Sequence, residues 1–88
     1  MHSKDFTDTL ASEGFETPVT VVRAPNGSLD VHTHVFEAKA LVIKGGLSIT
    51  AAGVEQAYAP GQVFHLAAML PHSERYGPEG VEYLVGRK

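Results

Sequence analysis

The 88-residue sequence contains no cysteine. Without thiols the chain can form neither a disulfide nor a thiolate metal site. A chain of this size is one domain, residues 1–88, and a domain this small buries only about 60% of the surface of its unfolded chain. Its stability must therefore come from an efficient core, from oligomerisation, or from a metal held by histidine or carboxylate side chains.

Long apolar runs and basic clusters are also missing. No stretch approaches the roughly 18 apolar residues of a membrane span, and the first residues, MHSKDFTD, lack the apolar stretch of a signal peptide. We therefore expect a cytoplasmic protein with no membrane partner. The formal net charge is −3 and the cationic residues are dispersed, so nucleic acid is not an expected partner either.

One segment has the pattern of a helix. In SKDFTDTLASEG, which starts at Ser3, Phe6 and Leu10 lie four residues apart and would form one apolar stripe. Ser3 is placed to cap the start, and Gly14 can take the left-handed conformation that ends a helix. About ten residues do not stay helical alone. We therefore expect this N-terminal helical segment, residues 1–15, to lie against a larger unit.

From Pro18 onward, short apolar segments alternate with glycine and proline every eight to twelve residues. This spacing is typical of an antiparallel sandwich or barrel. We predict an all-β barrel over residues 18–86. Its expected strands are 20–23, 29–36, 38–44, 47–51, 54–58, 62–67, 72–76 and 81–86.

Two of the expected strands are apolar on both faces. In AKALVIK, Ala38 and Val42 alternate with Leu41 and Ile43, and VEYLVG (81–86) has the same character. A sheet in a monomeric sandwich normally shows one polar face to water. The outer face must therefore be covered, either by the N-terminal helix or by a second subunit, and we predict a homodimer.

Histidine is the unusual residue type, with five in the chain. In LDVHTHVF, His32 and His34 lie two residues apart, so on a strand both side chains point to the same face. His72 opens another predicted strand directly after Pro71. If the two strands are neighbours, the three imidazoles form a facial set of nitrogen ligands suited to Fe, Mn, Ni, Cu or Zn. The alternative is that His32 and His34 face water on an exposed edge.

The segments that carry these histidines resemble the two signature motifs of the cupin superfamily. HTHVFEAKALVIKGG matches the first motif through His32, His34 and a terminal glycine, Gly45. YAPGQVFHLAAMLPH matches the second through a Pro-Gly turn and a final histidine, His72. The resemblance covers residues 20–86. It implies a jelly-roll barrel, or double-stranded β-helix, with a metal inside its mouth, and it implies frequent dimerisation.

The sequence departs from the cupin pattern at one expected ligand. Ala38 occupies the position where the family usually has a glutamate ligand, and the neighbouring Glu37 should face the other way by strand alternation. Either a β-bulge turns Glu37 inward as a metal ligand, or water completes a shell of three histidines, which we favour. The aspartate usual after the Pro-Gly turn is Gln62 here, which concerns only the turn.

Glu74 is a second acidic candidate, because it shares a strand face with His72. It could orient an imidazole, act as a catalytic general base, or supply a fourth metal ligand. The alternative is a solvated carboxylate paired with Arg75 or Arg87. His65, in the middle of a predicted strand, is expected to be a hydrogen-bonded structural residue or a surface residue.

The sequence thus predicts a divalent transition metal, Fe, Mn, Ni or Zn, held by His32, His34 and His72. One interpretation is a metalloenzyme that acts on a small, partly apolar molecule, and the resemblance implies dioxygenase or isomerase chemistry. The other interpretation is a non-catalytic cupin that binds a small ligand or a metal for sensing or storage.

Overall fold

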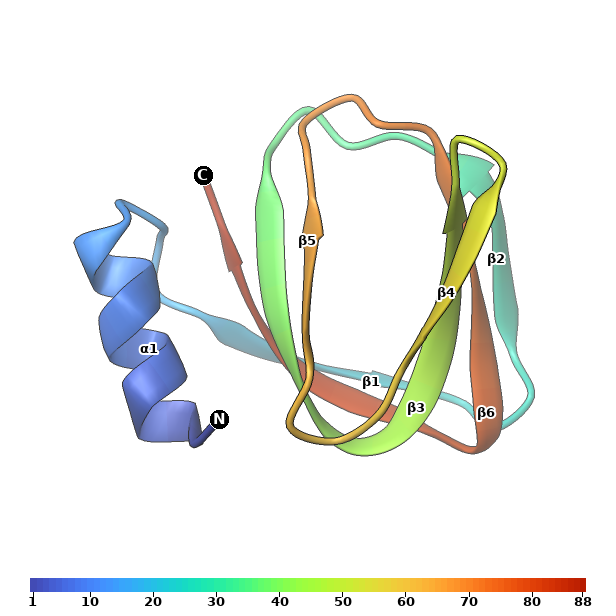
Figure 1. Cartoon of the computed structure of the whole chain (residues 1–88), viewed down its shortest axis with the longest axis horizontal. Coiled ribbons are helices and arrows are strands. Elements are labelled where there is room, and N and C mark those ends of the chain that lie inside the picture. Colours follow the sequence, from blue (N-terminus) through green and yellow to red (C-terminus); the bar gives the residue numbers. More distant parts are fainter.

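The computed structural model describes residues 1–88, which form one helix and six strands. The strands curl into a barrel, and the helix lies outside it (Figure 1). This confirms the all-β fold class with a short N-terminal helix. No helix has the length and apolar character needed to cross a membrane. The elements are α1 (Ser3–Ser12), β1 (Val19–Arg23), β2 (Ser28–His32), β3 (Ala38–Ala51), β4 (Val54–Tyr58), β5 (Val63–Leu66) and β6 (His72–Arg87).

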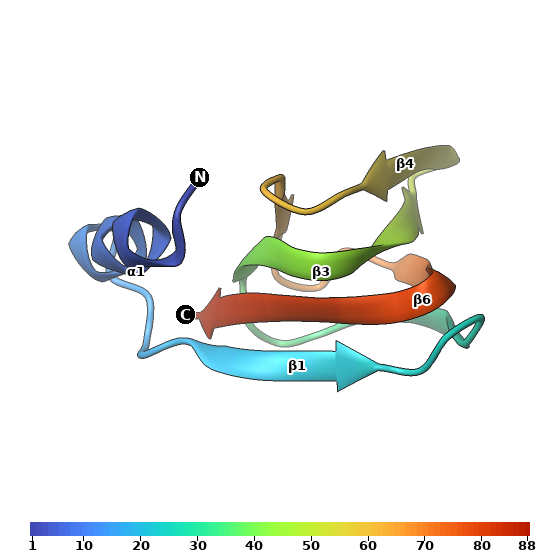
Figure 2. The same ribbon diagram turned by 90° about the horizontal axis from the view of Figure 1, so that it is seen from below.

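Two long strands, β3 and β6, organise the barrel. They run antiparallel side by side, with Ala38 opposite Arg87 at one end and Ala51 opposite His72 at the other (Figure 2). One half of this pair is flanked by β1 and β5, and the other half by β2 and β4. The six strands form one hydrogen-bonded sheet whose two halves have the strand orders β1-β6-β3-β5 and β2-β6-β3-β4 and share β3 and β6. This is the jelly-roll arrangement predicted from the sequence.

β3 and β6 each join two segments that were predicted as separate strands, so the expected strand ends at Gly45-Gly46 and Gly77-Pro78 are wrong. Gly45 and Gly80 have positive φ angles of 70° and 72°. A Cβ on Gly45 would lie 2.1 Å from the carbonyl oxygen of Gly80. The pairing of β3 with β6 shifts register on both sides of Gly45. The glycines therefore bend the two strands past each other without ending them.

The main core lies inside the barrel. It is formed by the inward-facing side chains of β3, β5 and β6, among them Ala40, Val42, Ile49, Phe64, Tyr76, Tyr83 and Val85. Ala38 and Val42 belong to this core, whereas Leu41 and Ile43 face the other way. The alternation predicted for this strand is therefore confirmed.

α1 covers the outer apolar face of the barrel. Phe6 and Leu10, both fully buried, pack with Phe15 and Leu41 in a second cluster that also contacts Ile43, Val63 and Leu84. Of the two covers expected for the doubly apolar strands, the N-terminal helix and a second subunit, the helix is therefore the one observed. Homodimer formation stays a prediction, which light scattering tests against the 9.4 kDa mass of one chain.

The ends of α1 agree only partly with the sequence prediction. Its N-cap residue is His2 and no side chain caps it, so the expected cap by Ser3 is wrong. Gly14 has a φ of 84°, the left-handed conformation expected after the helix.

Candidate metal centre

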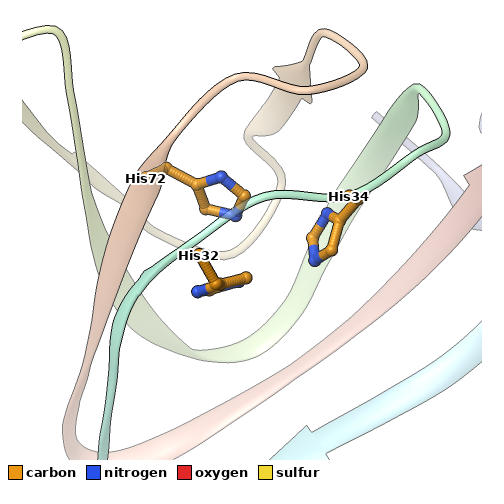
Figure 3. Close-up of side chains that lie close together, drawn as sticks. All are labelled: His32, His34 and His72. Carbon is orange, nitrogen blue, oxygen red and sulfur yellow. The ribbon is translucent and has the colours of Figure 1, made fainter.

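Three histidines from two distant segments of the chain converge on one point (Figure 3). His32 is the last residue of β2, and its partner across the neighbouring strand is His72, the first residue of β6. His34 lies just beyond β2, because this strand ends four residues earlier than expected. One possible ligand atom from each ring lies within 4.8 Å of the other two. The convergence expected from the sequence is therefore observed.

Backbone hydrogen bonds fix two of the rings. Nδ1 of His32 lies 2.7 Å from the carbonyl oxygen of Asp30, and Nδ1 of His72 lies 2.8 Å from that of Leu70. A carbonyl oxygen only accepts, so each Nδ1 carries the hydrogen and donates it. Nε2 of each neutral ring is then left with its lone pair free. Histidines that bind metals are commonly oriented in this way by their other ring nitrogen.

Nε2 of His72 has no hydrogen-bond partner, although the residue is only 2% exposed. A buried polar atom without a partner costs about 1–3 kcal/mol, so such an atom needs an explanation. At His34, burial lowers the pKa of the imidazole, and the neighbouring His72 and His32 lower it further. The ring of His34 is therefore held in its neutral form, the form that binds a cation.

Glu74 lies beside this cluster with its side chain almost fully buried. Its Oε2 is 3.5 Å from Nε2 of His72 and 3.6 Å from Nε2 of His32. The Tyr76 hydroxyl donates a hydrogen bond of 3.2 Å to its Oε1. Burial, together with the charge of Glu74, raises the pKa of Tyr76 well above its ordinary value, so the phenol remains a donor. The alternative pairing with Arg75 is not present, because Arg75 pairs with Glu55 at 3.0 Å.

Glu37 does not join the three histidines. Its carboxylate accepts a hydrogen bond from His65 and lies 3.9 Å from Nζ of Lys88. The bond with His65 lowers the pKa of Glu37, and the charge of Lys88 acts in the same direction. No bulge turns Glu37 inward, whereas its neighbour Ala38 lines the interior. His65 is half exposed and hydrogen-bonded, which agrees with the role expected for it.

A cavity of about 70 Å³ adjoins His32 and His34. Its apolar lining includes Phe36 and Phe64, and its charged lining consists of Glu74 and two arginines, Arg23 and Arg87. Two hollows of about 500 and 510 Å³ elsewhere contain none of the three histidines.

The sequence predicts a place near the site for neither arginine: Arg87 is expected only as an ion-pair partner of Glu74. Arg87 instead packs over the ring of Phe36, with Cζ 5.2 Å from the ring centroid. Strand alternation was the signal that could have identified Arg87, since it shares a face of β6 with Tyr83 and Val85.

No family model matches the sequence, and no curated protein is significantly similar to it. Solved structures do match. An RmlC-like cupin from Shewanella frigidimarina has a TM-score of 0.68 at 17% identity, over 81% of this chain and 64% of that one. Oxalate decarboxylase from Lactobacillus farciminis has a TM-score of 0.72 at 24% identity, over 81% of this chain and 22% of that one. This chain has the cupin fold.

A protein of unknown function from Rhizobium leguminosarum is more similar to this chain in length. Its TM-score is 0.70 at 18% identity, over 93% of this chain and 89% of that one. The resemblance seen in the sequence is thus confirmed at the level of the fold. The chain spans less than two thirds of the Shewanella and Lactobacillus proteins. Function must therefore be argued from the site.

Proposed function

We propose that this cupin binds one divalent transition metal through His32, His34 and His72. The observation that carries the proposal is Nε2 of His72, which is buried, has no protein partner and lies beside two other imidazoles. A cation at this point would give that nitrogen the partner it lacks. Neutral imidazoles suit Fe, Mn, Ni and Zn.

A metalloenzyme of dioxygenase or isomerase type is the function this site supports best. A bound divalent cation supplies Lewis-acid polarisation of a substrate oxygen. The protein contributes the surroundings. The buried carboxylate of Glu74 lies beside the site, and Phe36 and Phe64 give the cavity an apolar wall. Arg23 and Arg87 would favour a substrate that carries negative charge.

The size of the cavity limits what can bind. Sites for drug-sized ligands have volumes of about 300–1,000 Å³, whereas the cavity beside the histidines has about 70 Å³. A substrate would therefore have only a few non-hydrogen atoms. The same observation favours the second candidate function, a non-catalytic cupin in which the metal itself, with a few waters, is what the protein holds or senses.

Metal analysis of the purified chain tests the proposal. We expect about one equivalent of a first-row transition metal per chain, and its loss from His32→Ala, His34→Ala and His72→Ala variants. His65→Ala is the matched control, because His65 lies outside the cluster and should leave the metal content unchanged. Retention of metal by a variant lacking all three histidines would refute the site. Metal-dependent oxygen uptake or turnover of small anionic substrates would separate the enzyme from the non-catalytic protein.

A further inference from the structure

We infer that Glu74 is a fourth protein ligand of the metal, so that the site consists of three imidazoles and one carboxylate. The inference rests on the proposed function, because it needs a metal at the three histidines. It concerns a residue of β6, two positions after His72, whose side chain points to the same face of that strand.

The distances around Glu74 carry the argument. Its Oε2 lies 3.5 Å and 3.6 Å from the Nε2 atoms of His72 and His32. These separations exceed the roughly 2.7–3.2 Å of a hydrogen bond. Two ligand atoms bound to one ion at about 2.0–2.2 Å lie about 3.0–3.5 Å from each other. The carboxylate oxygen therefore lies from each of the two nitrogens at close to the spacing of neighbouring ligands around one cation.

The surroundings of Glu74 leave this oxygen available. The hydroxyl of Tyr76 donates to Oε1, which fixes the carboxylate and leaves Oε2 facing the histidines. The side chain of Glu74 is only 7% exposed, and no lysine or arginine forms an ion pair with it. A buried carboxylate is costly unless a cation compensates it. A divalent ion between Glu74 and the imidazoles would compensate the negative charge of this carboxylate.

The position of Glu74 also sets the direction from which it would bind. The ligand atoms that all lie within 4.8 Å of one another belong to the three histidines alone. Its distances place Glu74 on the side of the cluster formed by His32 and His72, and sharing one ion with His34 requires its carboxylate to move toward that ring. The other nearby glutamate, Glu37, is engaged by His65 at the surface and is not available. Ala38, which lines the interior, has no ligand atom.

Titration of the purified chain with Co(II) tests this assignment, because the visible spectrum of the ion reports its coordination independently of any activity. The variants are Glu74→Gln, which keeps the size of the side chain, Glu37→Gln as the matched control, and His72→Ala. We expect Glu74→Gln to weaken Co(II) binding by about 10–100-fold, at least the effect of losing an outer-shell partner, and to change the spectrum. We expect Glu37→Gln to match the unmodified chain in both readouts.

The outcomes separate this inference from the proposed function. If the unmodified chain binds no Co(II), or if His72→Ala binds as tightly, the proposed function fails and the inference fails with it. If His72→Ala loses the ion but Glu74→Gln keeps the original spectrum, the three-histidine site stands and ligation by Glu74 is refuted. This holds even if the affinity falls, since an unchanged spectrum would mean that Glu74 only positions the histidines.

A second variant covers the case in which Glu74→Gln does not fold, which thermal unfolding of the metal-free protein would reveal. Glu74→Asp keeps the charge but withdraws the carboxylate by one methylene. We expect an affinity between those of the unmodified chain and the histidine variant, with a shifted spectrum. An unchanged spectrum in Glu74→Asp would overturn the inference.

Discussion

The chain places a glutamate next to a histidine in two regions, one at the surface and one inside the barrel. At the surface, the side chains of Glu37 and His65 are 31% and 50% exposed and join directly in a hydrogen bond. Inside, those of Glu74 and His72 are 7% and 1% exposed and stay 3.5 Å apart. In the surface pair, Nε2 of His65 has the carboxylate of Glu37 as its partner, whereas in the inner group Nε2 of His72 has none.

This difference shows what identifies a candidate site in this molecule. Both regions contain the residue types that bind metals, so composition does not distinguish them. Burial removes the water that could serve as a partner, and the spacing inside the barrel prevents the side chains from serving one another. Only the inner group is therefore built to receive something else.

The largest expected effect is the stabilisation of the fold by metal. A ligand at 100 times its dissociation constant stabilises the folded state by about 2.7 kcal/mol, and each kcal/mol raises the Tm of a domain of this size by about 4–8 °C. Saturating Co(II) or Zn(II) should therefore raise the Tm by more than about 10 °C. The same rise is expected for His65→Ala, and none for His72→Ala. Equal rises of the Tm in these two variants would contradict the assignment of the metal to the inner histidines.

The next effect concerns the ionisation of His34 in the metal-free protein. Burial, followed by the neighbouring His72 and His32, lowers the pKa of His34 below 6.5. His34 therefore binds a proton less readily in the folded chain than in the unfolded chain. Its contribution to the free energy of unfolding is complete above pH 6.5 and is lost as the pH falls through the lowered pKa. An NMR titration should show the lowered pKa. His72→Ala should restore only part of it, because burial is the larger cause, whereas His65→Ala should change nothing. A pKa of His34 at or above its ordinary value would contradict this account of the inner cluster.

The smallest effect is expected at the surface pair. The hydrogen bond with His65 lowers the pKa of Glu37 from about 4.5. Its carboxylate therefore stabilises the fold above this pH, and the contribution is lost as the pH falls through the lowered pKa. Glu37→Gln should make the decline of the Tm between about pH 5 and pH 3 shallower, and only slightly, because water screens exposed pairs. Glu79→Gln, at an exposed glutamate without an ion pair, is the control. Identical slopes for the two variants would show that the bond with His65 contributes nothing.

Local patterns predicted most of the inner region. The alternation along β3 assigned Ala38 and Val42 to the inside and Leu41 to the outside, as observed. Alternation also placed His32 and His34 on one face. Their convergence with His72 was expected only if the two strands are neighbours, as the resemblance to the cupin motifs implies, and the structure shows it.

The remaining features depend on contacts between distant residues. Gly45 marked a strand end in the sequence, but its close approach to Gly80 turns it into a bend within a longer strand. The pairing of Glu37 with His65 joins residues 28 positions apart and could not be read locally. The sequence allowed either α1 or a second chain to cover the outer face of the barrel. The cluster that Phe6 and Leu10 form with Leu41 shows that the helix provides this cover.

A crystal grown with Co(II) and measured at its absorption edge would locate the bound ion. We expect one strong anomalous peak among His32, His34 and His72, about 2.0–2.2 Å from the Nε2 atoms of His32 and His72. An ordered crystal with no peak there, or with its only peak beside His65 and Glu37, would contradict the assignment of the metal to these histidines.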